Sequence, residues 1–117
     1  MLTIRTPQMA MFRELEVQKF EDWTLGHLKK FFPRECDGMG EQKVRETIGY
    51  GIQRAAYHKI TAKRDVAKYI DLMVVFGRNF DTDRRTKWAG DILRQGGYSG
   101  TRMEALRRAA KLHLKRK

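Results

Sequence analysis

Residues 61–77 read TAKRDVAKYIDLMVVFG and carry the clearest structural signal in the chain. Their apolar residues recur every three or four positions, which is typical of one face of an α-helix. Thr61 precedes the predicted helix, which covers about residues 62–76. Gly77 fits a left-handed C-cap behind that helix. The buried side of the helix is expected to consist of Val66, Tyr69, Ile70, Met73 and Val74.

Helical periodicity continues toward the N-terminus. Thr6 and Pro7 are residue types preferred at the N-cap and first position of a helix, and Pro33 is expected to end that helix. Residues 34–40 contain two glycines and are expected to form a loop. Another helix is predicted at about residues 41–57, where two central glycines indicate close approach by another backbone segment.

The C-terminal third contains two more predicted helices. Thr82 or Asp83 is expected to cap a short helix that ends near Leu93. A glycine-rich loop follows this helix. Thr101 and Glu104 then match the capping-box pattern T-x-x-E, which predicts the start of the last helix.

These patterns together predict an all-α fold. No segment alternates apolar and polar residues as a half-buried strand does, so no sheet is expected. A chain of 117 residues is long enough to bury one modest core. We therefore expect a compact single-domain bundle of about five helices over residues 1–117, with a basic C-terminal helix at residues 101–117.

The positive charge is concentrated in the second half of the chain. Residues 1–60 contain 10 Lys or Arg and 8 Asp or Glu, whereas residues 61–117 contain 15 and 6. A surface of this sign attracts a polyanion or an acidic protein surface. Four cations at helical spacing form the candidate partner-binding face: Arg107, Arg108, Lys111 and Lys115. The alternative is a solvated surface whose cations suit the negative end of the helix dipole.

The large aromatic residues are expected mainly in the core. Those considered are Phe31, Phe32, Phe76, Phe80 and Trp88. Phe32 and Phe80 lie beside predicted helix ends, where an aromatic side chain can be exposed. If exposed, these two would be candidate anchors for a partner helix.

The sequence shows no catalytic or metal-binding pattern. Cys36 has no second cysteine, and the histidines fall in three separate segments without metal-ligand spacing: His27, His58 and His113. Asp81 and Asp83 could bind a divalent cation, but capping of the next helix is the preferred interpretation. We therefore expect no enzyme activity, no cofactor and no metal.

The location of the protein is expected to be cytoplasmic. A single cysteine excludes an internal disulfide and fits a reducing compartment. The N-terminus lacks the pattern of a secretory signal, and the longest apolar run, Leu72 to Phe76, is far too short to cross a membrane. A soluble protein without membrane association is the expectation.

Two stretches resemble a known group of proteins. They are MLTIRTPQM at residues 1–9, and ITAKRDVAKYIDLMVVFGRNFDTD with WAGDIL between Ile60 and Leu93. They resemble small helical proteins of Gram-negative bacteria that are often encoded beside secreted toxins and spike components of type VI secretion systems. The group has no known catalytic motif, so the resemblance implies no active-site residues.

The resemblance implies a non-enzymatic accessory role. Such a protein would be an effector adaptor, a chaperone or an immunity protein, and its partner would be a secreted toxin, an effector or a spike component. A rigid helical face would contact the partner, and charge would steer the encounter. The alternative is a small basic nucleic-acid-binding protein, because the net charge is +11.

Overall fold

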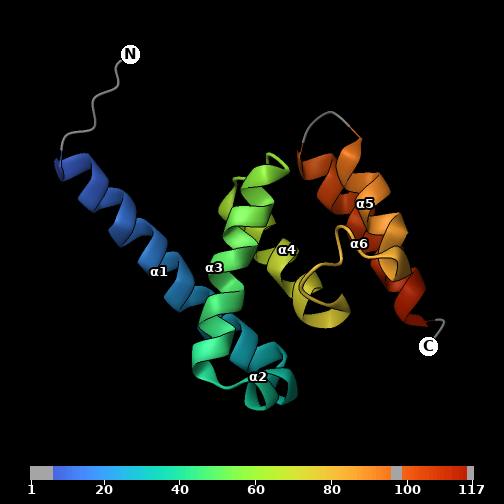
Figure 1. Cartoon of the computed structure of the whole chain (residues 1–117), viewed down its shortest axis with the longest axis horizontal. Helices are drawn as coiled ribbons and strands as arrows, with labels where there is room; N and C mark the ends of the chain where they lie inside the picture. Colours follow the sequence, from blue (N-terminus) through green and yellow to red (C-terminus); the bar gives the residue numbers. More distant parts are fainter. Residues whose placement is uncertain (1–6, 96–98, 116–117) are drawn as a thin grey trace. The chain divides into compact units, whose positions relative to one another are not determined.

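The computed structural model describes the backbone of residues 7–95 and 99–115, and the side chains of residues 16–95 and 100–114. Over these residues it contains six α-helices and one short 3₁₀ helix: α1 (Pro7–Phe31), α2 (Pro33–Met39), α3 (Glu41–Tyr57), α4 (Lys63–Phe76), η1 (Arg84–Thr86), α5 (Lys87–Arg94) and α6 (Ser99–Lys115) (Figure 1). No strand occurs in the described part of the chain. The predicted all-α class is confirmed, with one helix more than the five expected.

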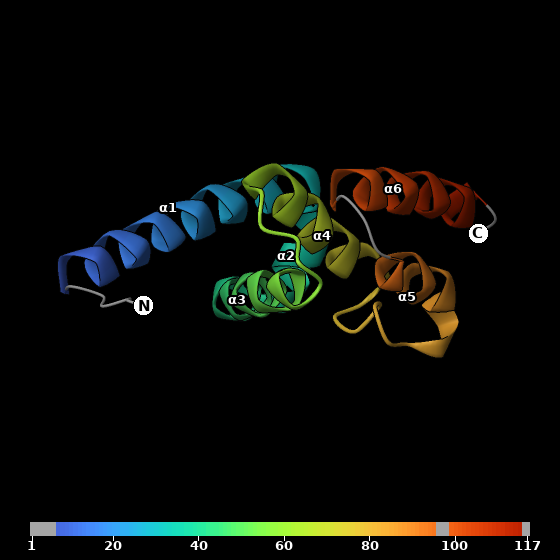
Figure 2. The same cartoon turned by 90° about the horizontal axis from the view of Figure 1, so that it is seen from above.

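The chain divides into two units, residues 1–45 and residues 46–117. The first unit contains α1, α2 and the first turn of α3. The second unit contains the rest of α3 and all elements from α4 to α6. Within the second unit, α6 packs on both α4 and α5, and the pairing of α5 with α6 is visible in Figure 2.

The first unit corrects one prediction, because residues 33–39 form α2 instead of a loop. Pro33 is the first residue of α2, where the missing N–H is harmless, and Glu35 lies favourably in the first turn. Gly40 has a positive φ of 84°, and its N–H donates to the Cys36 carbonyl at 2.9 Å. The glycines that suggested a loop therefore lie inside and at the end of a short helix.

The second unit confirms most of the predicted stripe of α4. Val66, Tyr69, Ile70 and Met73 are buried, whereas Val74 is only half-buried. A Cβ at Gly51 of α3 would lie only 2.6 Å from Ile70 Cγ1 and 2.9 Å from Met73 Sδ. The close approach predicted at this glycine is therefore present, although side chains of α4 make it instead of backbone.

The helix starts in the C-terminal third match the predictions only in part. Asp83 is confirmed as a cap, because its side chain accepts a hydrogen bond from the Arg85 backbone N–H at the start of η1. The predicted capping box is wrong, because α6 begins at Ser99 and Thr101 already lies in its first turn. Glu104 instead accepts a hydrogen bond from Arg107, one turn further along the helix.

Candidate functional site

The outward side of α6 carries the candidate basic residues. The buried side of this helix consists of Met103, Leu106 and Ala110. Arg107, Arg108 and Lys111 are exposed on the opposite side, as the helical spacing predicts. Lys115 belongs to the last turn of α6, but its side chain lies outside the described residues. We call Arg107, Arg108 and Lys111 the basic face.

One carboxylate lies at the N-terminal end of the basic face. Glu104 Oε1 accepts a hydrogen bond from Arg107 Nη2 at 2.9 Å and lies 3.4 Å from Arg108 Nε. The hydrogen bond and charge of Arg107, helped by Arg108, hold the pKa of Glu104 below its usual value. Because the single negative charge of Glu104 compensates only part of the positive charge of Arg107, Arg108 and Lys111, the basic face keeps a positive excess around Lys111.

Two exposed leucines flank the basic face. Leu112 is 63% exposed and Leu114 is 46% exposed. Their positions on the helix place one on each side of the three cations. The exposed surface of α6 is therefore a positive centre between apolar edges.

Arg102 does not belong to the exposed charge of α6. This residue is only 8% exposed, and its Nη1 donates to the Leu93 carbonyl at 3.0 Å. Leu93 is in the last turn of α5, where carbonyl groups lack partners within the helix. Arg102 therefore joins α6 to the end of α5.

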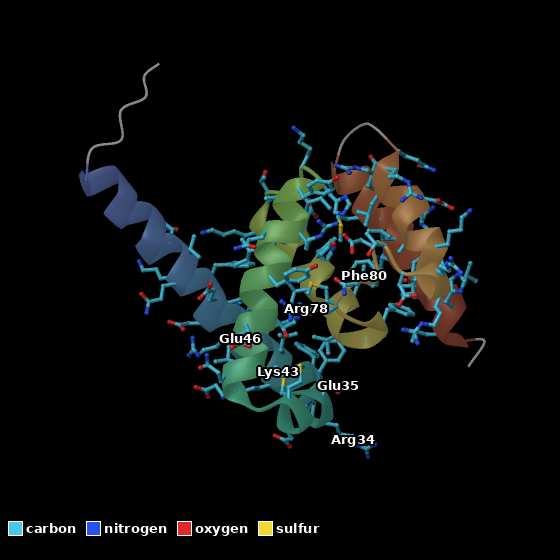
Figure 3. All side chains as sticks on the ribbon, in the orientation of Figure 1. Arg34, Glu35, Lys43, Glu46, Arg78 and Phe80 are labelled. Atoms are coloured by element: carbon cyan, nitrogen blue, oxygen red, sulfur yellow. The ribbon has the colours of Figure 1, made fainter. Side chains whose placement is uncertain are left out.

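The two candidate aromatic anchors have different environments. Phe80, labelled in Figure 3, comes from the turn after α4. It is fully buried, and its ring centroid lies 5.0 Å from that of Tyr69. The expectation that Phe80 lies in the core is confirmed, and the alternative that it is an exposed anchor is wrong, because the turn after α4 directs it into the core of the second unit. Phe32 lies between α1 and α2 and is half-buried.

Sequence reasoning missed a buried charge cluster in the second unit. Asp81 Oδ2 accepts a hydrogen bond from Arg54 Nε at 2.9 Å and a shorter one from Arg54 Nη2. His58 Nε2 lies 2.9 Å from the same oxygen. The Asp81 side chain is only 1% exposed, so its charge is compensated inside the protein instead of by water.

Protonation of this cluster follows from its burial and its partners. Burial disfavours the charged carboxylate of Asp81, but hydrogen bonds from His58 and Arg54 outweigh it and hold the pKa below its usual value. For the Tyr69 hydroxyl, burial and the nearby charge of Asp81 both raise the pKa well above its usual value. The stable state is therefore an ionised Asp81 beside a neutral Tyr69.

The surrounding contacts indicate that the cluster holds the turn before η1 in place. Arg78 lies over the Tyr50 ring at 4.1 Å, and the Tyr50 hydroxyl donates to Asn79 Oδ1 at 2.8 Å. A Cβ at Gly90 of α5 would lie 2.6 Å from the Asp81 carbonyl oxygen, so α5 packs directly on this turn. Asp81 therefore pairs with Arg54 and His58 inside the second unit, and it does not cap a helix. Of the two aspartates, only Asp83 caps one.

Cys36 lies at a pocket of the first unit. This pocket has a volume of about 390 Å³, and its lining includes Lys29, Asp37 and Glu41. Burial, followed by the charges of Asp37 and Glu35, raises the pKa of the Cys36 thiol. A thiol with a raised pKa is a poor nucleophile at neutral pH.

The three histidines lie in three different settings. His27 stacks on Trp23 with ring centroids 5.2 Å apart, and His113 stacks on Trp88 at 4.5 Å. His58 is hydrogen-bonded to the Asp81 carboxylate. Within the described residues, no three His, Cys, Asp or Glu side chains gather in a way that could hold a metal ion.

Comparisons of the chain with known protein families, curated proteins and solved structures find no match. Among the described residues, no helix has the length and apolar character needed to cross a membrane.

Proposed function

We propose that this chain is a non-enzymatic binding module whose basic face on α6 holds an acidic surface of a protein partner. The exposure of Arg107, Arg108 and Lys111 on a helix whose other side is buried is the observation that supports this function. Because the buried side fixes the helix within its unit, the three charges keep a constant spacing. Charges in fixed positions steer a complementary partner and raise its association rate.

The edges of the basic face suggest the chemistry of the partner. Leu112 and Leu114 offer apolar surface beside the cations. A partner segment with carboxylates in its centre and apolar side chains at its borders would match both features. Burial of the leucines would add affinity, whereas the cations would provide orientation and speed.

The biological setting that we propose is a type VI secretion or toxin system. Its support is the resemblance of residues 1–9 and 60–93 to small proteins encoded beside effectors and spike components. In this setting the chain acts as an effector adaptor, a chaperone or an immunity protein. A binding role also fits the chemistry of Cys36 and His58, since one has a raised pKa and the other is paired with Asp81.

Nucleic acid is the second candidate partner. The net charge of +11 and the exposed cations of α6 favour it. Affinity for nucleic acid would fall steeply with salt for any sequence, because each phosphate contact releases counterions. A protein complex with apolar edges would keep more of its affinity as salt rises.

A capture experiment separates these functions. The tagged chain is used to recover partners from its native host, with and without nuclease, at low and moderate salt. The test variant carries Arg107→Glu, Arg108→Glu and Lys111→Glu. The control carries Arg34→Glu, Lys63→Glu and Arg84→Glu, three other exposed cations, so both variants have the same net charge.

We expect one protein to be recovered by the wild type and the control, but not by the α6 variant. This protein should survive nuclease and moderate salt, and a toxicity assay of it would then distinguish an immunity protein from an adaptor. Equal recovery by both variants would place the interface elsewhere. Recovery of nucleic acid alone would support the second candidate.

A further inference from the structure

α1 has a second apolar face that the first unit leaves uncovered. Thr24, Leu25 and Leu28 are buried on one side of the helix. A row of rings follows another side, in the order Phe20, Trp23, His27 and Phe31. We call these four residues the aromatic stripe. Trp23 is 58% exposed and Phe31 is 60% exposed, although Phe31 was expected in the core.

The aromatic stripe is a continuous and ordered surface. Successive ring centroids are 6.4, 5.2 and 4.9 Å apart, and the first two pairs are stacked. Lys30 lies beside the stripe, with Nζ 5.5 Å from the centroid of Phe31. Rings that already support one another lose little conformational freedom on binding, so this surface is suited to an interface.

We propose that the aromatic stripe is the interface of a homodimer in which α1 pairs antiparallel with α1 of a second copy. A two-fold interface requires a surface that is complementary to itself. A two-fold axis across α1 at position 25 places Trp23 opposite His27 and Phe20 opposite Lys30. The same axis places Lys19, which is exposed, opposite Phe31. One arrangement thus creates two central ring pairs, each between Trp23 of one copy and His27 of the other, flanked on each side by cation–π pairs.

The charge balance of α1 favours a second copy over a polyanion. Residues 16–31 contain three Lys and three Asp or Glu, so this part of the helix has no net charge. The two α1 surfaces therefore add no net repulsion of their own to the approach of two copies, whereas nucleic acid would meet no excess of positive charge along them. The dimer does not depend on the function proposed for α6.

The test is sedimentation of the full chain over roughly 1–200 μM, the range in which a small interface of this kind dissociates. The variants are Trp23→Ala, Phe31→Ala and Lys30→Glu. Tyr57→Ala is the matched control, because Tyr57 is an aromatic residue 70% exposed outside the stripe. Circular dichroism establishes the helix content of each variant.

We expect the wild type and Tyr57→Ala to form dimers with similar dissociation constants. Trp23→Ala and Phe31→Ala should each raise this constant about tenfold or more. Trp23→Ala removes the Trp23–His27 ring pairs of the interface, and Phe31→Ala removes the cation–π pairs between Phe31 and Lys19. Lys30→Glu should also raise the dissociation constant. Because Lys30 is an exposed residue, this variant still tests the proposal if a ring variant fails to fold. A monomeric wild type would overturn the proposal, whether the stripe is then free or covered by another protein. Dimers unaffected by all three variants would also overturn it.

Discussion

His58 Nε2 and Asp81 Oδ2 lie 2.9 Å apart, and both side chains are almost completely buried. Arg54 donates to the same carboxylate oxygen. Residues from α3 and from the turn before η1 thus share one buried charge. These hydrogen bonds attach the turn between α4 and η1, which has no regular secondary structure, to α3 and the residue that follows it.

Loss of the Asp81 charge should destabilise the protein strongly. Asp81→Asn removes the buried carboxylate that pairs with half-buried Arg54, and we expect a loss of roughly 3 kcal/mol in the free energy of unfolding. Asp91→Asn is the matched control, because Asp91 makes only exposed ion pairs with Lys87 and Arg94. Its effect should stay below about 1 kcal/mol in chemical denaturation. Equal effects of the two substitutions would contradict a structural role for the cluster.

Ionisation of the Asp81 carboxylate should make the stability of the protein depend on pH. The pKa of this carboxylate is lower in the folded protein than the value of about 3.9 in an unfolded chain. The stabilisation is therefore fully present above about pH 4 and is lost as the pH falls through the lower, folded value. The stability difference between wild type and Asp81→Asn should narrow when unfolding is measured from pH 7 down to about pH 2. A constant difference across this range would argue against the proposed ionisation.

The pairing of Asp81 with Arg54 and His58 could not be predicted from the sequence. Most helices were predictable because their signals are local: apolar periodicity indicated α3 and α4, and a side-chain cap marked the start of η1. The exception is α2, whose glycines suggested a loop. Asp81 meets partners 23 and 27 residues earlier in the chain, and no local pattern carries that pairing. The neighbouring Asp83 does cap a helix, so the same short motif concealed two different roles.

The exposed surfaces were only partly predictable for a related reason. Helical spacing correctly placed three cations on one side of α6, because their position depends only on the helix itself. Phe31 and Phe80 were judged by their residue type, but their burial depends on what packs against each helix end. Both were expected mainly in the core; Phe80 is buried there, whereas Phe31 is 60% exposed.

The two helical glycines Gly51 and Gly26 should respond in opposite ways to alanine. Gly51→Ala places a Cβ 2.6 Å from Ile70 Cγ1, so we expect a loss of about 1–3 kcal/mol. Gly26→Ala meets no atom within 4 Å and improves helix propensity, which should add about 0.5–1 kcal/mol. Thermal unfolding of both variants checks this. A stabilising Gly51→Ala would contradict the packing of α3 on α4.

The arginines of α6 should divide into structural and surface residues. Arg102→Ala leaves the Leu93 carbonyl without its donor in a buried position, and we expect a loss of about 2 kcal/mol. Arg108→Ala changes an exposed side chain and should alter stability by no more than about 0.5 kcal/mol. Urea denaturation of the two variants measures this difference. Equal losses would mean that Arg108 also supports the fold.

The central claim is that the basic face of α6 steers a protein partner, and association kinetics test it most directly. The partner recovered by capture is mixed with the wild type, the α6 charge-reversal variant and the control with three other cations reversed, over a series of salt concentrations. We predict that the α6 variant associates about tenfold more slowly or worse and loses its salt dependence, while the control stays close to the wild type. Equal association rates for the two variants would contradict the account.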